Sequence, residues 1–301
     1  MEDASGEKMA MAPRARAIYD NCRVLDIDGE LLFRAGRRRL EWYLARGLAR
    51  RVDGDTIQLT FANKGTGRRG DAFYLQDMRN ECVVCGAGAP LTMHHVVPHQ
   101  YRQFMEEAVK SRSSHDLLPV CVGCHERYEA HAVRFKQHLA RCFAAPLEGE
   151  GWVERADIAR ARRAAAALLS DAVGRIPPAR IAELRAAVDA AVRQNGALFS
   201  DGPGAASAAS DSVLRELLGM PARVRGPAFR SHGEIVVGAV AARRGAARMP
   251  LCAACRALVC GGVAAFSSAW RSHFVEHARP AHLPAHWNAP APGSACGAIG
   301  L

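Results

Sequence analysis

Two CxxC pairs constrain this chain more than any other feature of its sequence. Cys82 and Cys85 form the first pair in "CVVCG", and Cys121 and Cys124 form the second in "CVGCH". A two-residue spacer folds into a knuckle that points both sulfurs at one ion, so two pairs supply the four ligands of a closed tetrahedral zinc site. We therefore predict a structural Zn²⁺ here. Unpaired thiols and a redox pair are the alternatives, and no thioredoxin-like βαβ pattern surrounds either pair to favour redox chemistry.

Histidines and an aspartate lie between and after these pairs. His94 and His95 follow the first pair, Asp116 precedes the second in "SHDLLPVC", and His125 follows Cys124 directly. This order resembles that of the zinc-bearing members of the HNH endonuclease superfamily, which run CxxC, a doublet ending in His, an Asn and then CxxCH. The resemblance covers residues 82–131. It implies a ββα-metal fold in which the zinc is structural and a second divalent ion carries the chemistry.

The resemblance also assigns roles to single residues. His94, Asp116 and His125 would bind a catalytic Mg²⁺ or Mn²⁺, and His95 would be the general base, for which a neutral imidazole with a pKa of about 6.5 is suitable. The family has Asn at the position of Asp116, which can hold the loop as Asn does or add charge at the ion. Two functions follow: a metal-dependent endonuclease that hydrolyses phosphodiester bonds in DNA or RNA, or an inactive zinc-stapled module that binds nucleic acid or a protein.

A further group of cysteines lies near the C-terminus, in "LCAACRALVC". Three cysteines are followed there by two histidines: Cys252, Cys255, Cys260, His273 and His277. Three cysteines and one histidine can bind a second zinc, but the spacing of Cys255 and Cys260 matches no common knuckle, so we expect buried or free thiols. His131 and His138, on the helix predicted after His125, are expected to be exposed polar residues.

Arginines are concentrated in residues 34–51, where seven of them accompany one acidic residue. The whole chain has 40 Lys and Arg against 30 Asp and Glu, a balance that suits a polyanionic partner. Such a run can follow phosphates by charge alone and is a candidate nucleic-acid surface, with a solvated helix face as the alternative. The residues are Arg34, Arg37, Arg38, Arg39, Arg46, Arg50 and Arg51.

The fold class predicted from these patterns is α+β and predominantly helical. A small ββα-metal (HNH-like) zinc module would be flanked by an N-terminal α/β segment and a C-terminal helical region. Shifts in composition predict the following segments: a disordered N-terminus (1–16), the N-terminal segment with the zinc module (17–145, core 82–131), a helical hairpin (146–199), a linker (200–212), a C-terminal helical segment (213–287) and a disordered tail (288–301).

Periodicity places the main elements. Leu40, Leu44 and Leu48 share the face of a predicted helix, and Pro178 is suited to begin a helix that ends at Gly196. Further helices are predicted at 101–111, from Gly123 onward, at 213–218 and at 265–277, and strands at 56–61 and 233–240.

Five blocks of sequence in order carry a second resemblance. They are "IYDNCRVLDIDGELLFRAGRRRLEWYLARGLA", "CVVCG", "VVPHQYRQF", "SHDLLPVCVGCH" and "WRSHFVEHARPAHLPAHW". Together they resemble the C-terminal region of the exonuclease 3'-5' domain-containing protein 2 family over most of residues 17–287. In that family an exonuclease domain with four acidic metal ligands precedes this region. We expect that domain to be absent here, so the resemblance implies nucleic-acid metabolism without 3'-5' exonuclease activity.

Hydropathy and the N-terminal sequence limit the compartments in which this protein is expected. No apolar run reaches the roughly 20 residues that a membrane helix needs, and the N-terminal "MEDASGEKMA" is too polar for a signal peptide. We therefore expect an intracellular protein without a membrane partner, in which cysteines serve as metal ligands or thiols rather than disulfides. The compartment (nucleus, cytoplasm or mitochondrion) and the oligomeric state are left open.

Overall fold

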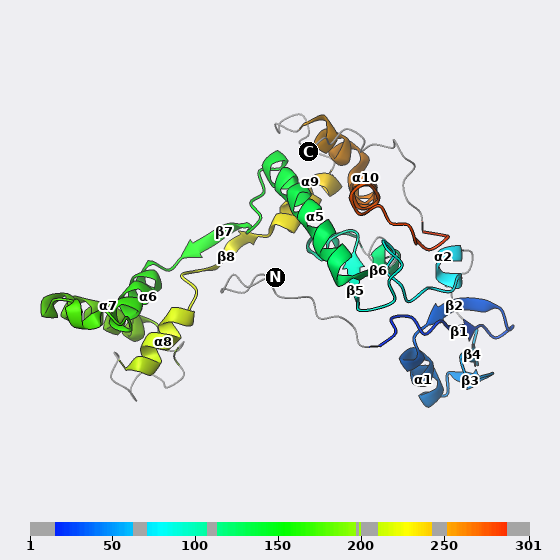
Figure 1. Ribbon diagram of the computed structural model, residues 1–301, viewed down its shortest axis with the longest axis horizontal. Coiled ribbons are helices and arrows are strands. Elements are labelled where there is room, and N and C mark those ends of the chain that lie inside the picture. Colours follow the sequence, from blue (N-terminus) through cyan, green and yellow to red (C-terminus); the bar gives the residue numbers. More distant parts are fainter. Residues whose placement is uncertain are drawn as a thin grey trace. The chain divides into compact units, whose positions relative to one another are not determined.

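The chain folds into two compact units. The computed structural model describes residues 16–62, 71–106, 113–196, 199, 210–242 and 252–287. The first unit combines Met1–Leu147 with His232–Leu301, and the second, Glu148–Ser231, is inserted between these two parts in the sequence. Both units mix helices with small sheets, and roughly half of the described residues are helical (Figure 1). The predicted α+β class is confirmed.

A four-stranded sheet begins the first unit. Its strands are β1 (Cys22–Leu25), β2 (Leu31–Ala35), β3 (Ala49–Arg51) and β4 (Thr56–Leu59), in the order β2-β1-β4-β3. β1 pairs antiparallel with β2 and parallel with β4. Helix α1 (Arg37–Ala45) connects β2 to β3, and its buried Leu40 packs with Val24 and Ile57 of the sheet. The helix predicted around Leu40 is thus confirmed but ends at Ala45, before Leu48, and the strand predicted at 56–61 is confirmed as far as Leu59.

A β-hairpin and a long helix form the middle of the first unit. β5 (Leu91–His95) pairs antiparallel with β6 (Leu117–Cys121), so that His94 lies opposite Leu118. α5 (Val122–Cys142) begins directly after β6 and confirms the helix predicted from Gly123. Strand, strand and helix therefore follow one another in the ββα order, with residues 96–116 between the strands.

Three short helical elements precede or separate these strands: α2 (Ala72–Leu75), α3 (His99–Arg102) and the 3₁₀ turn Ser113–Asp116. The Asp71 side chain caps α2 by accepting a hydrogen bond from the Phe73 N–H, 3.2 Å away. α3 ends earlier than the helix predicted at 101–111, and residues 107–111 of that prediction lie outside the described part of the chain.

The inserted unit is followed by α9 (His232–Ala242), which occupies the segment "GEIVVGAV". The strand predicted there is wrong. A Cβ on Gly233 would lie 1.8 Å from the Gln100 carbonyl oxygen, and Val236 and Val240 are buried in the core. Packing against α3 therefore outweighs the preference of valine for strands.

α10 (Ala253–Ala278) is the longest helix among the described residues and is kinked at Gly262. It confirms and extends the helix predicted at 265–277. By length and composition it could cross a membrane, which was not predicted from the sequence. Its large apolar side chains lie in the core, where the Trp270 and Phe135 rings are 4.6 Å apart, as expected of the central helix of a folded domain.

The second unit has its own core. α6 (Ala156–Leu168) and α7 (Pro178–Gln194) form the predicted helical hairpin, joined through the 3₁₀ turn Val173–Arg175, and α8 (Asp211–Gly219) packs on α6. β7 (Glu150–Glu154) pairs antiparallel with β8 (Arg223–Arg230). The core is built from one face of each helix: Ile158, Ala161, Ala165, Leu184, Val188 and Leu217.

The segment boundaries can be compared with those expected from composition. Residues 213–231, which composition grouped with the C-terminal helices, pack in the second unit, and the described residues 232–242 and 252–287 pack in the first. The expected linker (200–212) and the expected disordered ends (1–16 and 288–301) lie almost wholly outside the described residues.

Candidate metal centre

The four cysteines of the two CxxC pairs meet at one point. Their sulfurs all lie within 4.8 Å of one another, and the Sγ atoms of Cys85 and Cys121 are 3.8 Å apart. Four sulfurs held about 2.3 Å from a tetrahedral zinc would be about 3.8 Å from each other. The structure thus brings together the predicted ligands Cys82, Cys85, Cys121 and Cys124 in a cluster that can hold a metal ion.

Local backbone geometry aims these sulfurs. In the first knuckle the Gly86 N–H donates to the Cys82 carbonyl (2.8 Å), and Gly86 has a φ of +76°, a conformation that favours glycine. In the second knuckle Cys121 is both the last residue of β6 and the N-cap of α5, so Cys124 lies in the first helical turn. The hairpin register therefore fixes where the second pair of sulfurs points.

The electrostatic setting of the cysteine cluster favours a cation. Burial raises the pKa of the Cys124 thiol to about 12, and the three neighbouring sulfurs add to this rise. A bound cation would offset that cost, since metal ligation requires thiolates. The Arg127 guanidinium donates to Cys124 Sγ at 3.0 Å, and its positive charge favours the thiolate form that metal ligation requires.

A second cluster, the histidine cluster, consists of His94, His125 and Glu129. His94 Nδ1 lies 2.9 Å from His125 Nε2, and the Glu129 carboxylate completes a set of ligand atoms within 4.8 Å of one another. His94 comes from β5, whereas His125 and Glu129 are four residues apart on one face of α5. Two imidazoles and a carboxylate form a common ligand set for divalent transition metals.

Thr92 fixes the tautomer of His125. The Thr92 hydroxyl donates to the Val120 carbonyl (3.0 Å), and its oxygen lies 2.8 Å from His125 Nδ1. Since a hydroxyl has one hydrogen to donate, it accepts from Nδ1–H of His125. The lone pair of His125 is therefore on Nε2, which faces His94, as a metal-binding imidazole requires.

The histidine cluster is mostly enclosed. His94 and His125 are 5% and 6% exposed, and the ring of Phe274, from α10, stacks on His94 at a centroid distance of 5.3 Å. Burial, with the nearby His125, holds the pKa of His94 well below its usual range, and burial also lowers the pKa of His125. Both imidazoles are thus neutral near pH 7. Glu129, whose side chain is 35% exposed, forms the open edge and pairs with Lys136 at 2.6 Å.

Asp116 is held by a different partner. Its carboxylate accepts two hydrogen bonds from Arg271 of α10, at 2.7 and 3.0 Å. Burial alone would raise the pKa of Asp116, but the hydrogen bonds from His115 and Arg271 outweigh burial and lower it. The Asp116 carbonyl accepts from the Val96 N–H (2.8 Å), which holds the end of the loop against β5. The structure does not bring the Asp116 carboxylate to the histidine cluster.

His95 lies on the other face of β5 from His94, because neighbouring residues of a strand point to opposite sides. It is half-buried, and its ring centroid is 6.1 Å from that of His99 on α3. Burial, followed by the positive charge of Arg102 and by His99, lowers the pKa of His95. A neutral imidazole at pH 7 is the form that can accept a proton.

The C-terminal cysteines do not lie together as a group of three. Cys252 and Cys255 lie beside His138 and Cys142 at the end of α5, and Cys260 is exposed. His138, expected to be an exposed polar residue, is partly buried in this group. It points across to α10 instead of into solvent.

The other histidines named from the sequence pack as side chains of helices. The Nδ1 atom of His273 lies 3.0 Å from the Tyr128 hydroxyl, and His277 stacks on His131 at 4.6 Å. None of these three histidines belongs to a metal-ligand cluster of the described residues.

The arginines of the basic run differ in their partners. Three form ion pairs with acidic residues: Arg34 with Asp77, Arg37 with Asp55 and Arg51 with Glu41. Two lie over aromatic rings: Arg39 over Phe33 and Arg46 over Trp42. Arg38 and Arg50 form no ion pair with the described residues. Arg50 also donates a hydrogen bond to the side-chain oxygen of Gln58. Because no carboxylate of the described residues neutralises Arg38 or Arg50, these two are the most available for phosphates.

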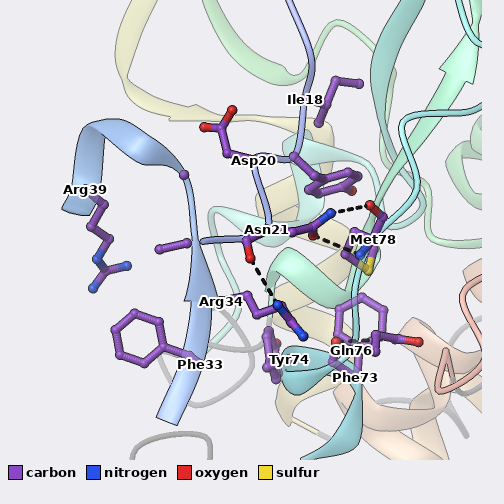
Figure 2. Close-up of a pocket in the computed structure, with 13 residues that line it drawn as sticks. Ile18, Asp20, Asn21, Phe33, Arg34, Arg39, Phe73, Tyr74, Gln76 and Met78 are labelled. Atoms are coloured by element: carbon purple, nitrogen blue, oxygen red, sulfur yellow. Dashed lines mark hydrogen bonds between the residues drawn. The ribbon is translucent and has the colours of Figure 1, made fainter. Parts of the chain in front are cut away.

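A cavity of about 600 Å³ lies beside the basic run. Figure 2 shows Asn21 in its wall: the side-chain amide exchanges two hydrogen bonds of 2.9 Å with the Met78 backbone, and the Asn21 carbonyl accepts from Arg34. Aromatic rings and guanidinium groups also line it: Phe33, Phe73, Tyr74, Arg34 and Arg39. Such groups can stack on an unpaired base.

Three residues of this centre were not predicted. Glu129 could have been found, because it lies four residues after His125 and so on the same helical face. Thr92 and Arg271 carry no local signal, and Arg271 is 155 residues from Asp116. Their roles depend on hairpin register and on long-range packing.

Known proteins show clear similarity to this chain. It is 30% identical to exonuclease 3'-5' domain-containing protein 2 of Drosophila melanogaster, over 92% of this chain and 44% of that protein. The human protein of the same name is 28% identical over 91% of this chain and 40% of that protein. Protein RRP6-like 3 of Arabidopsis thaliana is 43% identical over 133 residues, which are 43% of this chain and 15% of that protein.

The chain therefore spans less than half of the length of each of these relatives. No family model and no solved structure matches it. Over most of its length the chain is a homologue of the exonuclease 3'-5' domain-containing protein 2 proteins, as the five ordered blocks of its sequence predict.

Proposed function

We propose that β5, β6 and α5, together called the hairpin–helix module, form an HNH-type, metal-dependent endonuclease centre that hydrolyses phosphodiester bonds in DNA or RNA. The observation that carries the proposal is the histidine cluster, which is built on a β-hairpin and a helix joined by the cysteine cluster. Homologues named for an exonuclease domain support nucleic-acid chemistry in general. We assign Zn²⁺ to the cysteine cluster and Mg²⁺ or Mn²⁺ to the histidine cluster, where two imidazoles suit Mn²⁺ better than Mg²⁺.

Each residue has a role in this proposal. His95, neutral near pH 7, accepts the proton of the attacking water. His94, His125 and Glu129 hold the divalent ion, which would stabilise charge on the scissile phosphate. Asp116, predicted from the sequence as a ligand, instead positions the loop through its ion pair with Arg271. Lys136 neutralises Glu129 when that carboxylate holds no ion.

The ligand chemistry argues against an exonuclease centre in this part of the chain. An exonuclease domain of the related family carries four acidic ligands. Across the described residues, the three clusters that can hold a metal contain a single carboxylate, that of Glu129. The histidine cluster is therefore the better candidate for hydrolysis by the described residues.

The proposal is tested by assaying nicking of supercoiled plasmid and cleavage of single-stranded RNA with Mg²⁺ or Mn²⁺. We expect the His95→Ala variant to lose activity by about 10²–10⁴-fold, because a positioned general base contributes that much. The metal content of the cysteine cluster and the circular dichroism spectrum should be unchanged, since His95 belongs to none of the three metal-ligand clusters of the described residues.

His131→Ala is the matched control. His131 also lies on the hairpin–helix module but stacks on His277 outside all three metal-ligand clusters of the described residues, so this variant should cleave like the wild type. Wild-type protein that cleaves no faster than His95→Ala, or that cleaves equally well in excess chelator, would remove the nuclease proposal.

The enclosure of the histidine cluster favours a second candidate function. With His94 and His125 almost fully buried and Phe274 stacked on His94, the cluster can serve folding alone, in a zinc-stapled module that binds nucleic acid without cutting it. Tight binding of labelled DNA or RNA in fluorescence anisotropy, without any metal-dependent cleavage, is the result that selects this function.

Nucleic-acid binding is proposed to use the basic run in both cases. The double variant Arg38→Ala/Arg50→Ala should bind duplex DNA more weakly and reduce the slope of log K against log[salt] by about 1.8, since each phosphate contact contributes about 0.9. The control is Arg37→Ala/Asp55→Ala, which removes an ion pair without changing the net charge. Equal slopes for the wild type and for Arg38→Ala/Arg50→Ala would exclude these arginines from the interface.

A further inference from the structure

A second set of soft metal ligands joins the end of α5 to the start of α10. His138 and Cys142 are four residues apart, on one face of the last turns of α5, whereas Cys124 and His125 lie in its first turn. Cys252 and Cys255 form a CxxC pair at the N-terminus of α10. The four ligand atoms lie within 4.8 Å of one another.

The distances fit one tetrahedral ion. His138 Nε2 lies 3.5 Å from the Sγ atoms of Cys142, Cys252 and Cys255 alike. The Sγ atoms of Cys142 and Cys252 are 3.7 Å apart. Bonds of about 2.3 Å to sulfur and 2.05 Å to nitrogen predict about 3.5 Å between nitrogen and sulfur and about 3.8 Å between sulfurs.

Hydrogen bonding and disulfide formation do not account for this arrangement. Nε2 of a neutral imidazole is either one donor or one acceptor, so it cannot serve three equidistant sulfurs at once. A disulfide needs sulfurs about 2.05 Å apart, and a single bond between Cys142 and Cys252 would leave Cys255 and His138 without a partner in the group. One central cation satisfies all four ligands.

The Cys252–Cys255 pair is built as a metal knuckle. Cys252 is the N-cap of α10, and its Sγ accepts from the Cys255 N–H at 3.4 Å. The positive end of the helix dipole stabilises thiolate at this position, as zinc binding requires. Cys260, two turns further along the same helix, is exposed and takes no part.

We propose that His138, Cys142, Cys252 and Cys255 bind a second structural Zn²⁺, distinct from the ion of the cysteine cluster. The site fastens the two chain segments that flank the inserted unit Glu148–Ser231, with ligands up to 117 residues apart. It also anchors α10, the helix that carries Arg271 to Asp116 and Phe274 to His94. The zinc site stands whether or not the histidine cluster is a nuclease centre.

Zinc content and thiol reactivity test the proposal. Cys252 and Cys260 are both exposed, so in the zinc-loaded wild type Cys260 should react at once with iodoacetamide, whereas Cys252 should react only after a chelator is added. Because this measurement uses the wild type, it does not depend on a variant that folds. By elemental analysis, Cys252→Ser/Cys255→Ser should contain about one zinc per chain fewer than the wild type, with its α10 amides exchanging faster.

Two variants serve as controls. Cys260→Ser should keep the full zinc content, and His138→Cys should keep it as well because a fourth thiolate replaces the imidazole. Three results would overturn the proposal: Cys252 alkylated as fast as Cys260 in the zinc-loaded protein, equal zinc in the wild type and in Cys252→Ser/Cys255→Ser, or a Cys142–Cys252 disulfide in place of metal in peptide maps.

Discussion

Replacing Cys124 with serine is expected to unfold the hairpin–helix module of the first unit while the second unit stays folded. Cys124 is buried and supplies one of four sulfurs within 4.8 Å of each other. Structural zinc sites contribute about 10–16 kcal/mol in small peptides at neutral pH, which is comparable to the whole stability of a domain, about 5–15 kcal/mol. The free energy lost with the zinc should therefore exceed the stability that the core around α5 supplies.

The measurement combines zinc content with hydrogen exchange. Amides of α5 and β6 should exchange at rates close to those of an unfolded chain, and amides of α6 and α7 should keep their protection, because the second unit has its own core. Cys22→Ser is the matched control: Cys22 is fully buried in the N-terminal sheet but belongs to no metal cluster of the described residues. This variant should lower the free energy of unfolding by about 1–3 kcal/mol and keep the full zinc content. Normal zinc content and normal protection in Cys124→Ser would contradict the prediction.

Local patterns explain what the sequence could predict. A CxxC knuckle is formed by four consecutive residues, so its spacing alone brings two sulfurs together. The long helix after Gly123 follows from periodicity within one segment. In both cases the information lies within a few turns of chain, and the structure agrees.

The features that the sequence did not predict depend on contacts between residues far apart in the chain. Asp116 meets Arg271, and His138 meets Cys255, through the packing of α10 on α5, which no periodic pattern encodes. The segment from Gly233 to Val240 is rich in β-branched residues and yet helical, because its burial against α3 decides its conformation.

Three residues that were not predicted to lie in these clusters, Glu129, His138 and Cys142, did have a local signal. His125 and Glu129, like His138 and Cys142, stand four residues apart on a predicted helix, a spacing that places both side chains on one face. Such pairs are common on helices without a metal, so the signal becomes specific only when a second element brings further ligands to the same face. Here β5 brings His94 to the first pair, and α10 brings Cys252 and Cys255 to the second.

Asp116→Asn is expected to destabilise the first unit by about 3 kcal/mol, although Asn is the residue of the HNH pattern at this position. The two hydrogen bonds from Arg271 and the low exposure of both side chains, 9% for Asp116 and 24% for Arg271, make this a largely buried ion pair. Removing one charge leaves the other unpaired, which costs about 3–5 kcal/mol in such pairs, and the partial exposure of Arg271 favours the lower value. Urea unfolding of the wild type and the variant, with unchanged m values, measures the difference.

The pH dependence and a double variant show whether the ion pair is the cause. Because the folded-state pKa of Asp116 is lowered, its contribution is complete above the unfolded pKa of about 3.9 and is lost as pH falls through the folded value. The difference in the free energy of unfolding between the wild type and Asp116→Asn should therefore be constant near neutral pH and disappear below about pH 4. Asp116→Asn/Arg271→Gln should recover part of the loss, since no unpaired charge remains. If Asp116→Asn instead left stability unchanged at every pH but altered the affinity for Mn²⁺, the carboxylate would act at the ion and not at the loop.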